Sequence, residues 1–326
     1  MRRPLRATGA LLVAGALAAL APLAVAGSPA LAQPPTEAGC PVFPADNPIN
    51  QDISGAPVDP RSSRYIDAIG ANGHLHASFS NTLRYGIPYT VVGPQQPKVP
   101  VRILYSRATS DPGPYPIPLE APVQADPGGD RHVLVLQSGT CKLYELYAAR
   151  RHGGGWEAGS GAVFDLRSNA LRPDGWTSAD AAGLPIFPLL ARYQEARAGS
   201  IDHALRVTVE RTQRGYIHPA THFSSSERNP NLPPMGLRLR LKASFDLSGY
   251  YGQALVVLRA LKRYGLIVAD EGGSWNIGGA PNPGWVDHDL QQLERVPGSA
   301  FEAVGTGRIL HKGPTFHRHG RHRRPA

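Results

Sequence analysis

Short runs in which apolar and polar residues alternate recur along most of the chain between turn residues. Alternation of this kind predicts β-strands. The predicted strands cover residues 99–105, 132–137, 142–149, 162–166, 202–210, 237–245 and 266–269. Residues 111–122 hold several prolines, which lack the amide donor that a strand ladder needs, so we expect a loop there.

Helical spacing of apolar residues is found in fewer places. We expect helices over residues 63–70, over 177–182 with a resumption after Pro185 and Pro188 to about residue 198, and over 252–264, where Gly265 ends the helix. The chain holds 36 glycines and 32 prolines in 326 residues. Both residue types interrupt helices, which argues against a helical bundle. The pattern therefore predicts a mainly-β fold with a few helices, as a single β-sandwich or jelly-roll-like domain.

The N-terminal residues are typical of a secretory signal peptide. Arg2, Arg3 and Arg6 precede an apolar stretch over residues 7–26, and Ala30 and Ala32 supply the small residues that a signal peptidase reads. We expect cleavage after Ala32 and a secreted, extracellular protein. After residue 32 no apolar run reaches the ~18 residues that a membrane-spanning helix needs. Residues 33–62 are expected to form a Pro-rich extended arm, 63–310 the globular domain and 311–326 a basic, His/Arg-rich disordered tail.

The positive charge of the chain is concentrated at its ends. Of the formal net charge of +9, three arginines belong to residues 1–32 and five cations to residues 311–326, which leaves +1 for residues 33–310. A nearly neutral domain argues against nucleic-acid binding. The tail is expected to be solvated; binding of a metal or of anionic wall polymers is the alternative.

The only two cysteines, Cys40 and Cys141, lie in the part that would be exported. An even number in an oxidising compartment predicts one disulfide between them. Closing a loop of this length stabilises a protein by about 4 kcal/mol in the chain-entropy account. Two cysteines alone cannot complete a tetrahedral zinc site.

Standard catalytic and cofactor signatures are absent from the sequence. It has no Gly-x-Ser-x-Gly elbow, no His-Glu-x-x-His pair and no phosphate-binding Gly-x-x-x-x-Gly-Lys loop. We therefore expect no cofactor. We also expect no metal site, because Pro219 separates His218 from His222 and prevents a helical pair of ligands.

Two acids are the first candidates for catalysis. Asp180 and Glu195 are expected on the interrupted helix, and glycosidases use two carboxylates roughly 5–9.5 Å apart. The alternative for Asp180 is a purely structural role in the first turn of that helix, beside Ser178 as its cap. Asp270 with Glu271 forms another possible pair, ranked lower because adjacent residues of an extended chain point apart.

Histidines and arginines nearby suggest further roles. His203 shares the apolar face of the strand 202–210, where it is either a core histidine or part of an internal cleft, while Arg206 lies on the polar face as a ligand-binding or a solvated residue. His222 is a candidate for proton transfer. On the strand 237–245, Arg238 and Arg240 form a row of cations with Lys242, either for an anionic polymer or as protection of an exposed edge.

Tryptophans complete the candidate set. Trp275 and Trp285 flank a turn-rich loop, and exposed tryptophans on such loops form stacking platforms for sugar rings. Packing in the core is the alternative.

Several segments together resemble one family. They are GIPYTVV at 86–92, GWTSADAAGLPI at 175–186, DHALR at 202–206, PPMGLRLRLK at 233–242 and LKRYG at 261–265. They are similar to a family of secreted bacterial and fungal proteins that is known mostly as hypothetical proteins. The resemblance runs from about residue 40 to residue 304 and implies one continuous, exported domain. It implies no activity.

These observations converge on an exported carbohydrate-active protein that cleaves a polysaccharide, as a glycoside hydrolase or a polysaccharide lyase. Asp180, Glu195, His203 and His222 would be catalytic, and Arg206, Arg238, Arg240 and Trp275 would bind the polymer. The alternative is a non-catalytic secreted protein that binds glycans or the cell wall.

Overall fold

Strands make up most of the regular structure in the computed structural model, which describes residues 34–125 and 129–313. The described residues group into one unit. The prediction of a mainly-β fold with few helices is confirmed. The strands form four separate, unclosed sheets, and several of their pairs are parallel. The finer prediction of a sandwich or jelly roll stays a prediction.

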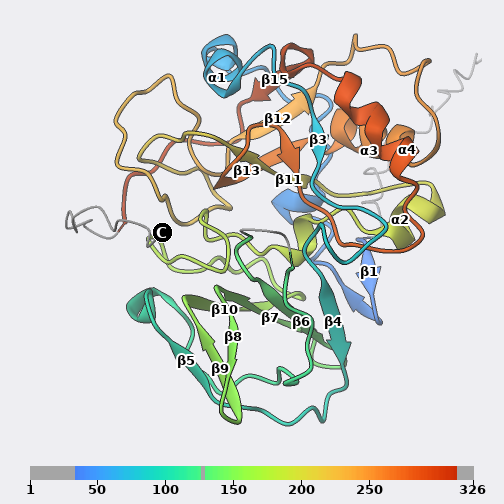
Figure 1. The fold of residues 1–326 in the computed structure, drawn as a ribbon. Coiled ribbons are helices and arrows are strands. Elements are labelled where there is room, and N and C mark those ends of the chain that lie inside the picture. The colour runs from blue at the N-terminus through green and yellow to red at the C-terminus, as the bar shows by residue number, and fades with distance from the viewer. Residues whose placement is uncertain (1–33, 126–128, 314–326) are drawn as a thin grey trace, which may run out of the picture. The chain divides into compact units, whose positions relative to one another are not determined.

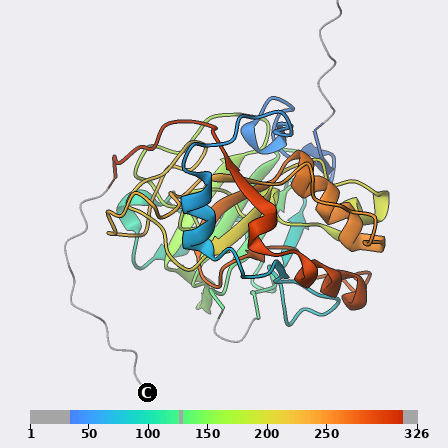
Figure 2. The same cartoon turned by 90° about the horizontal axis from the view of Figure 1, so that it is seen from above.

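The largest sheet has six strands. Their order is β15 (Phe301–Val304), β12 (Arg238–Leu241), β13 (Leu266–Glu271), β11 (Leu205–Val209), β14 (Asn276–Ile277) and β3 (His76–Ala77). The central pair of β11 and β13 is parallel, and its register shifts between Val207 and Thr208. Figures 1 and 2 both show α1 (Ser62–Ile69) beside β15. The helix α3 (Gly252–Arg263) contacts β12 and α4 (Asp287–Gln291).

A second sheet has four strands in the order β10 (Ser160–Asp165), β7 (Lys142–Tyr147), β6 (Val133–Gln137) and β4 (Tyr89–Val92). All five residues of β6 are buried, and its side chains alternate between two hydrophobic clusters. Leu134 and Leu136 belong to the larger cluster, and Val133 and Val135 to the smaller one. This explains why the strand reads as a continuous apolar run.

The remaining elements are short. A three-stranded sheet has the order β5 (Val101–Ile103), β9 (Gly155–Ala158) and β8 (Arg150–His152), and β1 (Thr36–Glu37) pairs with β2 (Cys40–Pro41). The helix α2 covers Tyr193–Ala198. The 3-10 helices are Pro48–Asn50, Arg107–Thr109, Phe187–Leu189, Gln292–Arg295 and Gly298–Ala300.

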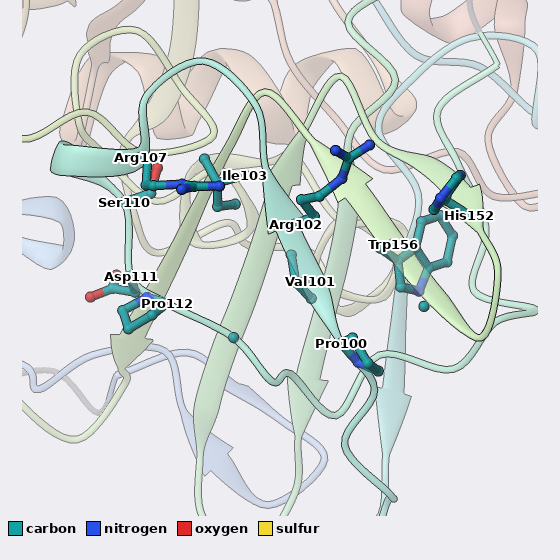
Figure 3. Close-up of a pocket in the computed structure, with 12 residues that line it drawn as sticks. Pro100, Val101, Arg102, Ile103, Arg107, Ser110, Asp111, Pro112, His152 and Trp156 are labelled. Carbon is teal, nitrogen blue, oxygen red and sulfur yellow. The ribbon is translucent and has the colours of Figure 1, made fainter.

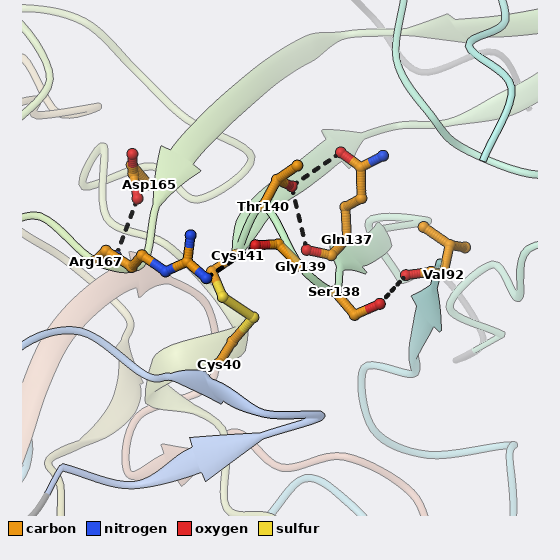
Figure 4. The surroundings of a disulfide bond; sticks show 9 residues. All are labelled: Cys40, Val92, Gln137, Ser138, Gly139, Thr140, Cys141, Asp165 and Arg167. Carbon is orange, nitrogen blue, oxygen red and sulfur yellow. Dashed lines mark hydrogen bonds between the residues drawn. A yellow bond between two sulfur atoms is a disulfide. The ribbon is translucent and has the colours of Figure 1, made fainter. Parts of the chain in front are cut away.

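The predicted disulfide is confirmed. Cys40 and Cys141 are bonded across a sequence separation of 101 residues. Figure 4 shows the bond linking the β1–β2 hairpin to the turn between β6 and β7. The N-terminal arm is thus tied covalently to the four-stranded sheet.

One predicted helix is wrong. Residues 177–182 form turns and bends, and helix appears only in α2. The main chain here bonds to distant partners instead of to itself, since the amide of Ala182 donates to the carbonyl of Ala269 at 3.0 Å. The Ser178 hydroxyl accepts from the amide of Asp180 at 2.9 Å. Local bonding of Ser side chains of this kind competes with helix formation.

Within the described residues, no helix combines the length and the apolar character that a membrane crossing requires. The predicted signal peptide, residues 1–32, lies outside the described residues, as does most of the predicted tail, residues 311–326.

Candidate functional site

A buried ion pair joins the turn at residues 177–182 to the six-stranded sheet. Arg206, on β11, donates from Nε to Asp180 Oδ2 at 3.1 Å and from Nη2 to Asp180 Oδ1 at 2.9 Å. Both side chains are buried, and the amide of Ala181 also donates to Asp180 at 3.1 Å. A two-point contact of this kind fixes both groups in orientation.

A second acid shares the same arginine. Asp270, near the end of β13, lies 3.7 Å from Nη2 of Arg206, and its side chain is 19% exposed. Burial raises the pKa of Asp270 well above its usual value, and the charge of the neighbouring Asp180 raises it further, against the opposing effect of Arg206. The site therefore disfavours the charged form of Asp270, the acid that lacks the two-point contact with Arg206.

Two more titratable groups lie in the interior beside this pair. Glu145, on β7, is fully buried and accepts hydrogen bonds from the amides of Ile186 and Phe187 at 2.9 Å. Burial raises the pKa of Glu145 to about 8, although these bonds oppose the shift. His132, just before β6, donates from Nε2 to the carbonyl of Ala179 at 3.0 Å, and burial lowers its pKa, which keeps it neutral.

Asp130 and Tyr147 lie on the solvent-facing side of these titratable residues. Asp130 is exposed and interacts electrostatically with both Asp270 and Tyr147. The chain that presents it has two non-glycine residues in the left-handed region, Arg131 with φ of 55° and Ala148 with φ of 49°, and the amide of Ala148 donates to the carbonyl of Asp130 at 2.8 Å. Strained backbone of this kind concentrates at functional sites.

We call this group the Asp180 cluster. Its members are Asp130, His132, Glu145, Asp180, Arg206 and Asp270. The sequence indicated Asp180 and Arg206 directly and Asp270 as a lower-ranked acid, but not the other three. One available signal was Glu145, a carboxylate in the middle of an otherwise apolar strand. The cluster places Asp270, an acid with a raised pKa, beside a second carboxyl group and an arginine, which is an arrangement that suits general acid–base chemistry.

Glu195 and His203 form a separate group. Glu195, on α2, contacts Arg192 Nη2 at 2.5 Å and His203 Nε2 at 3.2 Å. Burial opposes its ionisation, but the charges of Arg192 and His203 outweigh burial and hold the pKa of Glu195 at about 2. The ion pairs of Glu195 are with Arg192 and His203 and that of Asp180 is with Arg206, so the structure brings Glu195 together with His203 and Asp180 together with Arg206.

His222 lies close to the turn of Asp180. Its Nδ1 donates to the carbonyl of Ala181 at 2.8 Å. Burial lowers the pKa of His222, so the ring is neutral at pH 7.

Arg238 and Arg240 are not exposed as expected. Their strand, β12, has neighbours on both sides, so it is not an edge either. Arg238 donates to the carbonyls of Pro48 and Tyr264 at 2.7 and 2.5 Å, and Arg240 to the carbonyl of Ile53 at 2.6 Å. Arg240 also forms an ion pair with Glu302 at 2.6 Å. Both side chains anchor the N-terminal arm on the sheet.

The tryptophans expected to form a sugar platform are buried. Trp275 stacks on Phe301 with ring centroids 5.0 Å apart and donates from Nε1 to the carbonyl of Gly70 at 2.8 Å. Trp285 packs against Phe79 at 4.9 Å. Trp275 and Trp285 are therefore both packed in the core, which was the alternative to a sugar-stacking platform.

No family model, curated protein or solved structure matches the chain. Across the described ranges, no group of three or more His, Cys, Asp or Glu side chains could hold a metal ion.

Proposed function

We propose that the protein is an exported carbohydrate-active enzyme that cleaves a polysaccharide, with Asp270 as the proton donor. The observation that carries the proposal is the arrangement of Asp180 and Asp270 around one arginine, in which burial and the charge of Asp180 raise the pKa of Asp270. An enzyme that breaks a glycosidic bond needs a carboxylic acid that is still protonated near neutral pH.

Position separates the roles of the acids. Asp180 is fully buried and held by Arg206, so it sets the charge that keeps the proton on Asp270. Asp270 is partly open to solvent and can reach a substrate oxygen. Asp130, exposed and within electrostatic range of Asp270, supplies a second carboxylate on the solvent side, as the base for water or as the group that stabilises developing positive charge.

Two further observations support export. The disulfide between Cys40 and Cys141 suits an oxidising compartment, and no helix of the described residues could cross a membrane. The signal peptide over residues 1–32 and the arrangement of the sheets as a sandwich belong to this proposal as expectations.

The test is an assay of the chain without residues 1–32 on neutral and acidic polysaccharides, measuring both reducing ends and the ultraviolet absorbance of unsaturated products. Reducing ends without absorbance indicate hydrolysis; both signals together indicate a lyase. For Asp270→Asn we expect kcat to fall about 10²–10⁴-fold, because an amide cannot donate the proton. The exposed Asp67 provides the control variant Asp67→Asn, which should be fully active.

Full activity of Asp270→Asn would contradict the assignment of the proton donor. Loss of activity in Glu195→Gln with a properly folded protein would move the chemistry to Glu195 and His203.

A non-catalytic glycan-binding protein is the second candidate. It is favoured by a pocket of about 620 Å³ whose lining is mostly polar and includes Asn81, Tyr85, Asn276 and Asp287 but no member of the Asp180 cluster. Retention of a polysaccharide without any cleavage would support this function.

A further inference from the structure

A pocket of about 560 Å³ lies beside the three-stranded sheet, apart from the Asp180 cluster in its lining. Figure 3 shows β5 between the segment of residues 107–113 and the hairpin of β8 and β9. Side chains from all three segments line it. Arg102, Arg107 and His152 are the basic groups among them.

The basic groups outnumber the acids that could neutralise them. Arg102, Arg150 and His152 surround a single carboxylate, that of the buried Glu157, with Arg150 at 2.6 Å and His152 at 3.8 Å. Both arginine side chains are more than half exposed. One carboxylate cannot use the ten donors of two guanidinium groups, so donors remain that face the pocket and solvent.

Arg107 contributes a cation with no partner. It is exposed, and nothing in residues 34–125 or 129–313 forms an ion pair or hydrogen bond with its guanidinium. The acid nearest in sequence, Asp111, lines the same pocket but is bound by the buried Arg172. Asp111 therefore neutralises Arg172 and not Arg107.

Trp156 forms part of the pocket wall. Its side chain is buried in the smaller hydrophobic cluster, and its indole N–H is itself buried and has no acceptor. This donor does not face the open pocket, so it is not counted among the groups available to a ligand.

We infer that this pocket binds an oxyanion, a carboxylate or sulfate group carried by an acidic polysaccharide. Arg107 and Arg102 supply the charge and the hydrogen-bond donors. Arginine suits such groups because its planar donors match two oxygens at once. The inference uses no residue of the Asp180 cluster and stands without the proposed function.

The experiment is titration calorimetry with four probes, namely a sulfated heparin oligosaccharide, an oligogalacturonate, neutral maltohexaose and inorganic sulfate. We expect binding of at least one of the two acidic oligosaccharides and none of maltohexaose. The oligosaccharide that binds shows whether the pocket recognises a sulfate or a carboxylate group. Affinity should fall as salt is added, because these cations are exposed to screening.

Variants locate the binding. Arg107→Gln and Arg102→Gln should each weaken binding at least 10-fold. Arg64→Gln removes an exposed arginine of α1 and should change nothing. Asp270→Asn should bind normally, which separates this inference from the proposed function.

Three results would overturn the inference. They are equal affinity for the acidic and neutral oligosaccharides, wild-type affinity in Arg107→Gln and Arg102→Gln, and no binding of either acidic probe.

Discussion

Asp270 and Glu195 are both largely buried beside an arginine, yet their pKa values are shifted in opposite directions. Glu195 is the carboxylate that Arg192 pairs with, His203 also contacts it, and these neighbours outweigh burial, so the pKa of Glu195 falls to about 2. Arg206 is shared by two acids, and the bidentate contact goes to Asp180. Burial raises the pKa of Asp270, the charge of Asp180 raises it further, and the shared Arg206 does not offset both effects. The number of carboxylates that share a cation thus affects how far that cation offsets the burial of each acid.

Glu145 extends the comparison to an acid without a cation in contact. Its oxygens accept only main-chain amides, and burial raises its pKa to about 8. Amide donors alone thus compensate less for burial than one dedicated arginine does.

The largest effect is expected for Glu195→Gln. The variant leaves the buried Arg192 without its ion-pair partner, which costs about 3–5 kcal/mol in the free energy of unfolding. Because folding lowers the pKa of Glu195 from 4.5 to about 2, its contribution is present above pH 4.5 and is lost as the pH falls through 2. Guanidinium unfolding measures the loss. The exposed Glu210→Gln is the control, and equal stability of the two variants would show that Arg192 is satisfied without Glu195.

Asp180→Asn should have an intermediate effect. It weakens a charge-assisted contact at a cost of about 2 kcal/mol and leaves Arg206 with Asp270 as its only carboxylate. We therefore expect the pKa of Asp270 to fall toward the usual range. Carbon-13 NMR of the Asp270 carboxyl group measures this pKa. An unchanged pKa would mean that burial alone sets it, and the sharing of Arg206 would then be irrelevant.

Glu145→Gln should have the smallest effect, below about 1.5 kcal/mol at pH 5, because the acid it replaces is neutral there. Folding raises the pKa of Glu145 from 4.5 to about 8, so its contribution is fully present below pH 4.5 and is lost as the pH rises through 8. The wild type should lose stability relative to the variant over this window. Parallel stability curves from pH 5 to 8 would show that Glu145 is ionised throughout.

Local patterns predicted local structure well. The helices α1 and α3 and the strands β6 and β13 lie where periodicity and turn residues predict them. The helix expected over 177–182 failed because its amides bond to distant segments, which no window of sequence contains.

The candidate site was less predictable for the same reason. The link between Asp180 and Arg206 crosses 26 residues, and Asp270 joins them only because β13 pairs with β11. Arg238 and Arg240 carried the pattern of an exposed strand, but both are buried against the N-terminal arm, a segment far away in the sequence whose carbonyls they contact. Charge pattern alone does not distinguish a cation facing solvent from one facing carbonyl groups.

The contacts of Arg238 and Arg240 with main-chain carbonyls determine which mutations the N-terminal arm tolerates. Arg238 and Arg240 hold it through the carbonyls of Pro48, Ile53, Ser54 and Ala56, which every amino acid carries. Most substitutions along residues 48–56 would therefore preserve the anchoring. Insertion or deletion of a single residue would shift each carbonyl out of reach, so the arm is constrained in its length far more than in its composition.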